Sequence, residues 1–145
     1  MAGIFHEARQ ALAQELARFR NRQFLDAAMA ATALVAMADG EVSLPEQVTL
    51  DQVLETVQEL RIYDPHAAVD IYRDHVDALA ADSYAAREKI LETVARLAGD
   101  EAAGNVLIHA CVAIAKSDDD FSPPAQIAVR ELCRALGLDP ATFDI

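Results

Sequence analysis

Two stretches of this chain carry similar sequences, and each one follows a long run of apolar residues. The first reads ADGEVSLPE over residues 38–46, and the second reads SDDDFSPPA over residues 117–125. Aligning Asp39 with Asp118 sets an offset of 79 residues (118 − 39). Apolar residues on both sides keep that offset, in the pairs Met29 with Ile108, Val35 with Ile114, Val48 with Ile127, Val53 with Leu132 and Val57 with Leu136. The repetition predicts two copies of a helix–acidic loop–helix unit, at about residues 23–60 and 102–138.

The composition favours a helical fold in one domain. Hydrophobic residues make up 53% of the 145 residues and aromatic residues only 6%, with no tryptophan. Ala and Leu are good helix formers, whereas sheets are enriched in β-branched and aromatic residues. A chain of this length typically forms one compact domain. We therefore expect a single helical domain over residues 1–145.

The net charge restricts the partners. The formal net charge is −12. A field of this sign repels nucleic acid and anionic lipid, and it attracts cations and basic proteins. We therefore exclude nucleic-acid binding and expect a cation or a basic protein as the partner.

The spacing of apolar residues predicts about seven helices and no strand. The first helix carries an amphipathic stripe formed by Ile4, Ala8, Leu12, Leu16 and Phe19. The second is expected over residues 23–38, and the others begin near residues 43, 64, 82, 101 and 122. Cap signals mark these boundaries, with Ser43, Asp64 and Ser122 at helix starts and Gly99 and Gly137 at helix ends. The predicted fold is an all-α bundle with internal pseudo-two-fold duplication.

Neither long apolar run is expected to cross a membrane. Residues 27–38 and 106–115 fall short of the ~20 residues that span a bilayer. Charged residues interrupt the apolar residues near the start, which speaks against a signal peptide. Cys111 and Cys133 lie in apolar helical patterns, which favours buried thiols in a reduced compartment. We expect a cytoplasmic protein without a membrane span.

The acidic residues of the two repeated loops are the candidate metal ligands. Asp39 follows a predicted helix end, where unpaired carbonyls and the helix dipole disfavour negative charge. Such crowding costs free energy unless water or a cation offsets the repulsion, and hard oxygen ligands suit Ca²⁺ or Mg²⁺. If the duplication is symmetric, the two loops could face one another and share one acidic pocket. The predicted ligands are Asp39, Glu41, Glu46, Asp118, Asp119 and Asp120.

A plain structural interpretation of the same residues stays open. The loop is not an EF-hand, because Asp39 to Glu46 spans only eight residues. Glu46 stands three residues after Ser43, which is the spacing of a helix capping box. Asp120 could merely flank the cap at Ser122.

No catalytic site is predicted. His66 and His75 are nine residues apart, so a helix turns them to opposite faces. His109 is expected to be partly buried and hydrogen-bonded to a neighbour. No residue pattern indicates a nucleophile, and we expect that the protein is not an enzyme.

The pattern Asp39-Gly40-Glu41-Val42-Ser43-x-x-Glu46, repeated near the C-terminus, resembles the tellurite-resistance TerB family. The resemblance covers about residues 23–143. It implies a helical bundle with internal duplication, and metal-site positions at Asp39, Glu46 and Asp118. Asp119 stands where the motif has glycine, and Ala125 where it has glutamate. The second half-site therefore lacks one expected ligand.

Two functions follow from the residues and the resemblance together. The first is a divalent-metal-binding module in tellurite resistance or general stress response, which acts through other stress-response or membrane-associated proteins. Such partners would also bring it to the inner membrane as a peripheral protein. The alternative is a metal-free protein–protein interaction domain that docks a basic partner on its acidic face.

Overall fold

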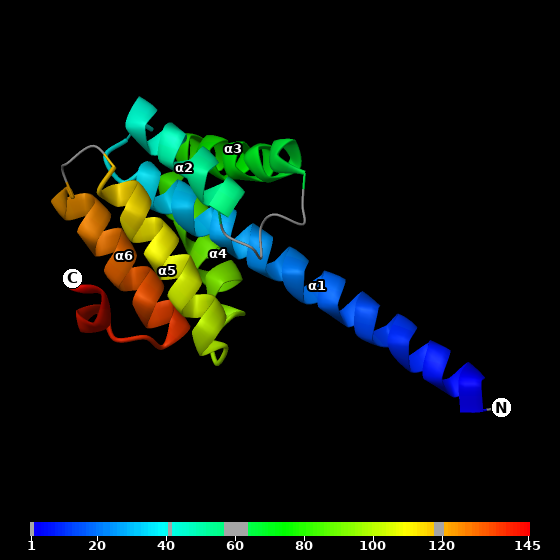
Figure 1. Cartoon of the computed structure of the whole chain (residues 1–145). Coiled ribbons are helices and arrows are strands. Elements are labelled where there is room, and N and C mark those ends of the chain that lie inside the picture. Colours follow the sequence, from blue (N-terminus) through cyan, green and yellow to red (C-terminus); the bar gives the residue numbers. More distant parts are fainter. Residues whose placement is uncertain (1, 41, 57–63, 118–120) are drawn as a thin grey trace.

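The computed structural model describes residues 2–40, 42–56, 64–117 and 121–145, with the side chains of residues 2–5, 14–20 and 53–56 left aside. Within these ranges the chain forms helices and no strand, which confirms the all-α prediction. The elements are α1 (Ala2–Ala36), α2 (Leu44–Thr56), α3 (Pro65–Ala81), α4 (Ser83–Ala95), α5 (Glu101–Ala115), α6 (Pro123–Leu136) and the 3₁₀ turn η1 (Pro140–Phe143) (Figure 1). Across the described residues, none of these helices is both long and apolar enough to cross a bilayer.

Most helix boundaries follow the predicted caps. The side chain of Asp64 accepts a hydrogen bond from the backbone N–H of His66 at the start of α3. Asp82 is the N-cap of α4 and accepts a hydrogen bond from the backbone N–H of Ala85. Gly137 ends α6 with a φ of 72°, a left-handed conformation that glycine adopts without steric cost. Each of these caps depends on residues only a few positions apart, so the sequence alone is enough to predict them.

The prediction of two separate helices before residue 38 is wrong. α1 is one helix of 35 residues, and it continues through the expected break near residues 20–22. Neither Gly nor Pro occurs between residues 4 and 36. Arg20, Arg22 and Gln23 are good helix formers, and Asn21 alone costs only a few tenths of a kcal/mol. The apolar pattern changes here, but nothing stops the helix.

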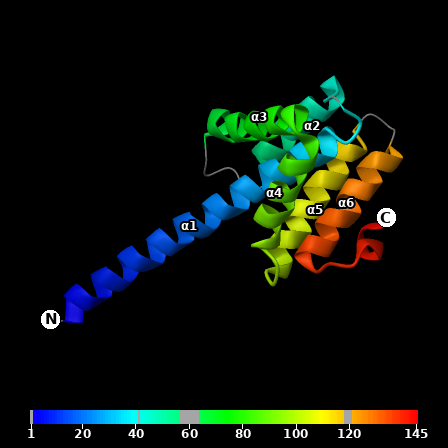
Figure 2. The same cartoon turned by 180° about the vertical axis from the view of Figure 1, so that it is seen from behind.

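The inner half of α1 forms the centre of the bundle. Every residue from Ala27 to Ala36 is buried, and this segment contacts α3, α4, α5 and α6. Figures 1 and 2 show these helices around it from both sides. The one polar side chain in the segment, Thr32, donates its hydroxyl to the Ala28 carbonyl at 2.8 Å. Because that bond satisfies the hydroxyl locally, a threonine is tolerated in an otherwise apolar core.

The outer half of α1 leaves the bundle and extends into solvent (Figures 1 and 2). We call residues 2–22 the arm. Residues 6–13 are all exposed, and Leu12 keeps 61% of its surface accessible. The predicted amphipathic stripe is present in the sequence, but the described part of it packs against nothing in this molecule.

Candidate functional site

One residue of each acidic loop region, Asp39 and Ser122, lies in contact with the other at one end of the bundle. We call residues 37–43 the first junction and residues 116–122 the second junction. The Ser122 hydroxyl donates a hydrogen bond to Asp39 Oδ1 at 2.7 Å, across 83 residues of sequence. Asp39 of the first junction and Ser122 of the second therefore lie side by side. The symmetry itself stays a prediction.

The structure describes two of the six predicted ligands. Asp39 is exposed and Glu46 is buried. Glu41 and Asp118, Asp119 and Asp120 lie outside the described residues. Within the part of the chain that is described, no three His, Cys, Asp or Glu side chains gather into a set able to hold a metal ion. Metal binding by the six residues therefore stays a prediction.

The first junction turns sharply at Gly40. This residue has a φ of 97°, a backbone conformation that residues other than glycine rarely adopt. Its N–H donates to the Met37 carbonyl at 2.9 Å, and the Ala38 N–H donates to the Val35 carbonyl at 3.2 Å. The turn thus follows directly on the end of α1 and holds Asp39 at the surface.

Glu46 forms the capping box that its spacing predicts. Its Oε1 accepts the Ser43 backbone N–H at 2.9 Å, while the Ser43 hydroxyl accepts the Glu46 backbone N–H at 3.3 Å. Only 5% of Glu46 is exposed. One carboxylate oxygen is therefore committed to starting α2, where it helps to fix the exit of the first junction.

Buried Glu46 acts on Tyr72 of α3. Burial raises the pKa of the Tyr72 phenol to about 12, and the negative charge of Glu46 adds to the shift. Tyr72 is 5% exposed and lines a pocket of about 290 Å³ between α2 and α3. The helix that follows the first junction is thus packed on α3 through a neutral phenol.

Tyr72→Phe is expected to flatten the alkaline loss of stability. In the wild type, the unfolded phenol loses its proton near pH 10, while the folded phenol keeps its proton until about pH 12. The free energy of unfolding therefore falls as pH rises between these values. Denaturant unfolding at several alkaline pH values measures this slope. The control is Tyr84→Phe, because Tyr84 is 74% exposed. An unchanged slope in Tyr72→Phe would contradict the pKa assignment.

The second junction is fastened at both ends. The Ser117 hydroxyl donates to the Ile114 carbonyl at 2.7 Å, and the Gln126 side-chain amide donates to the Phe121 carbonyl at 2.8 Å. Lys116 Nζ lies 5.8 Å from the centre of the Phe121 ring, within cation–π range. The Lys116 ammonium thus lies over the ring of a residue five positions further along the chain.

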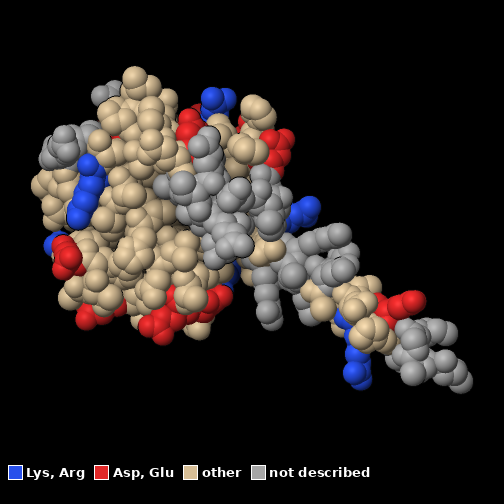
Figure 3. Space-filling view, viewed as in Figure 1, with Lys and Arg blue, Asp and Glu red and all other residues tan. Residues whose placement is uncertain are grey.

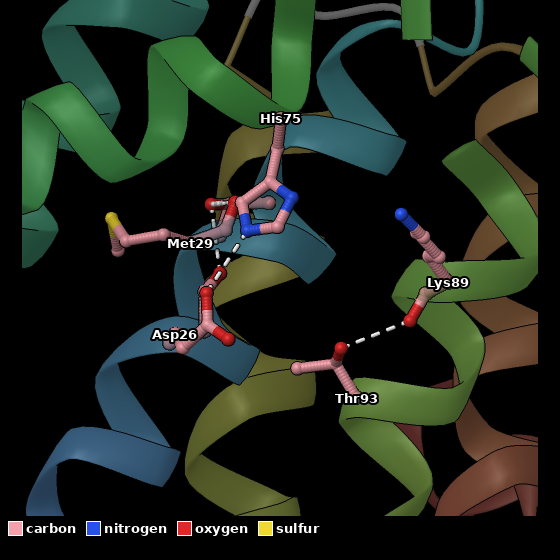
Figure 4. A network of polar contacts seen from close by, with 7 residues as sticks. Asp26, Met29, His75, Lys89 and Thr93 are labelled. Carbon is pink, nitrogen blue, oxygen red and sulfur yellow. Dashed lines mark hydrogen bonds and ion pairs between the residues drawn. The ribbon is translucent and has the colours of Figure 1, made fainter. Parts of the chain in front are cut away.

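The sequence did not predict the polar contacts between distant helices, which include the ion pair of Arg87 in α4 with Glu131 in α6. His75 Nε2 of α3 lies 3.0 Å from Asp26 Oδ1 of α1, and both side chains are partly exposed (Figure 4). The same view shows the Thr93 hydroxyl donating to the Lys89 carbonyl at 2.9 Å. Asp26 and His75 are 49 residues apart, and no sequence motif links them. The pair bridges α1 and α3 and lies outside both junctions.

The other histidine and cysteine predictions have mixed outcomes. His109 is exposed, and its ring meets Phe143 edge-on at 5.1 Å between centroids, so the prediction of a partly buried histidine is wrong. Cys111 and Cys133 are both fully buried, as predicted. Burial raises the pKa of each thiol. These thiols are therefore core residues, not nucleophiles.

Comparison with known proteins agrees with the fold and the junctions. The family model described as tellurite resistance protein TerB matches residues 25–145. Searches among curated proteins and among solved structures found no match. The matched region begins in the inner half of α1 and includes both junctions, whereas the arm lies outside it. The chain belongs to the TerB family of tellurite resistance proteins.

Proposed function

We propose that this protein is a non-enzymatic, divalent-metal-binding module of tellurite resistance or general stress response. It works in the cytoplasm through partner proteins, which include stress-response and membrane-associated proteins. The observation that carries the proposal is the 2.7 Å hydrogen bond from Ser122 to Asp39. It joins the two acidic junctions at one place on the surface.

The sequence around this bond concentrates negative charge. Asp118, Asp119 and Asp120 lie two to four residues before Ser122, and Glu41 follows Asp39 by two residues. Carboxylates that lie close together repel one another, and a bound cation would offset this repulsion. Ca²⁺ and Mg²⁺ both favour carboxylate oxygens, and Asp39 retains acceptor capacity beyond its bond to Ser122.

Glu46 and Ser43 have a supporting role in this proposal. Their capping box fixes where α2 begins, and therefore where the first junction ends. A cation held between the junctions would connect α1 and α2 to α5 and α6. The partner would then recognise a surface whose arrangement depends on the ion.

Thermal unfolding with and without cation tests the metal site. Ca²⁺ or Mg²⁺ at a hundredfold excess over its dissociation constant is expected to stabilise the protein by about 2.7 kcal/mol, relative to chelator. Asp39→Asn keeps an acceptor for Ser122 but removes charge. It is expected to lose most of this stabilisation, while its stability in chelator stays equal or rises.

The matched control is Asp77→Asn, which makes the same charge change at an exposed position of α3. It is expected to keep the full cation effect. Two results would contradict the proposal: no cation effect on the wild type at millimolar concentration, or an equal effect on Asp39→Asn and the wild type.

The alternative is a metal-free interaction domain with an acidic docking face. The hydrogen bond of buried Glu46 in the capping box favours this alternative, because capping α2 explains the residue without a metal. This function predicts no cation effect on unfolding. It also predicts that binding to a basic partner weakens strongly as salt is added.

A further inference from the structure

The arm is a long helix that carries the predicted amphipathic stripe, and the described side chains of this stripe, Ala8 and Leu12, are exposed. Residues 2–22 would extend about 30 Å at 1.5 Å per residue. In Figure 3 the coloured atoms of the outer part of the arm lie apart from the body of the molecule. A helix of this length is marginal in water by itself, because most helical stability comes from packing an apolar face. The stripe therefore needs a partner surface.

The apolar positions are arranged symmetrically about Leu12. Ala8 and Leu16 stand four residues to either side of Leu12. Phe5, which is next to Ile4 of the predicted stripe, and Phe19 stand seven residues to either side. Steps of three and four residues keep all five positions on one face of a helix. Because the spacing of these apolar positions is the same in both directions from Leu12, this face can pair with an identical helix that runs the opposite way.

The distribution of charge indicates the same partner. Residues 2–22 carry four arginines and two glutamates, a net charge of +2, so the rest of the chain carries −12 − 2 = −14. An anionic membrane would repel a body of that charge. A second copy supplies a matching apolar stripe, and the outer half of its arm, residues 2–11, places no net charge against the basic half of the arm.

Charge also selects the antiparallel direction. Residues 2–11 carry Glu7 and Arg9, a net charge of zero, while residues 13–22 carry Glu15 with three arginines, a net charge of +2. Antiparallel arms place each charged half against a neutral half and keep the two acidic bodies at opposite ends. Parallel arms would place +2 against +2 and one body beside the other.

We propose that two copies of this chain associate through their arms, which pair antiparallel about a two-fold axis at Leu12. In this register, position 8 lies opposite position 16 and position 5 lies opposite position 19. A small residue thus meets a large one, and an aromatic residue meets an aromatic one. The interface is isologous, because the same surface serves both copies.

Sedimentation of the full chain in chelator tests the pairing without any contribution from metal. The wild type is expected to be a dimer, and Leu12→Glu a monomer. Gln10→Glu is the matched control, since it adds the same charge on the opposite face of the helix, and it is expected to remain a dimer. A monomeric wild type, or a dimer that persists in Leu12→Glu, would overturn the proposal.

A distance measurement tests the direction, whatever Leu12→Glu does to the arm. A spin label on His6→Cys, with Cys111 and Cys133 shielded by burial, reports the separation of the two arms. Antiparallel pairing about Leu12 places the two labelled positions twelve residues apart along the axis, about 18 Å. Labels side by side would overturn the antiparallel direction. If the wild type is a monomer and co-sediments with phosphatidylglycerol vesicles, the choice of a second copy as partner is wrong.

Discussion

Ile114→Ala is expected to lower the free energy of unfolding by about 2 to 5 kcal/mol. Ile114 lies in the last turn of α5 and is 0% exposed. Its carbonyl also accepts the Ser117 hydroxyl at the start of the second junction. Truncating the side chain removes buried apolar surface and leaves a cavity, because the surrounding helices relax only in part. Urea unfolding followed by circular dichroism measures the loss.

The control for this change is Ile127→Ala on α6. It makes the same chemical change at a position that is 51% exposed. The expected loss is below about 1 kcal/mol, since less apolar surface leaves water on folding and alanine is the better helix former. Equal losses at the two positions would contradict the assignment of Ile114 to the core.

Ser122→Ala is expected to cost about 1 to 3.5 kcal/mol. The hydroxyl has two functions: it accepts the Ala125 backbone N–H at 3.3 Å as the N-cap of α6, and it donates to Asp39. Loss of a serine N-cap costs about 0.5 to 2 kcal/mol, and loss of a hydrogen bond about 0.5 to 1.5 kcal/mol. Chemical denaturation in chelator measures the sum.

Two further variants separate the cap from the contact between junctions. Ser122→Asp keeps an N-cap acceptor but places a second carboxylate against Asp39, so it is expected to retain the cap and lose the contact. A double-mutant cycle with Asp39→Ala is expected to give a coupling free energy of about 0.5 to 1.5 kcal/mol. A coupling of zero would mean that the hydrogen bond does not hold the junctions together.

Local features of the fold could be predicted from the sequence because their causes are local. The capping box of Ser43 and Glu46 and the left-handed Gly137 depend on residues within four positions of each other. The sequence wrongly predicted two helices in place of α1 for a related reason. Its apolar pattern changes near residue 21, but a helix ends only where the backbone or a cap ends it.

Contacts between distant residues could be predicted only where the sequence repeats. The offset between Asp39 and Asp118 suggested that the two junctions face one another, and the bond from Ser122 to Asp39 confirms that they are adjacent. Asp26 and His75 share no such repeat, so their contact across α1 and α3 had no signal in the sequence. Whether the acidic side chains bind a cation depends on side-chain geometry, which spacing does not fix.

The continuity of α1 has a mechanical consequence. Between residues 4 and 36 the helix contains no Gly or Pro that would act as a hinge, and its last ten residues, Ala27 to Ala36, are all buried. A force or torque applied at the tip is therefore carried by a stiff lever to the middle of the fold. A partner that binds the arm therefore fixes the orientation of the whole body as well as its position.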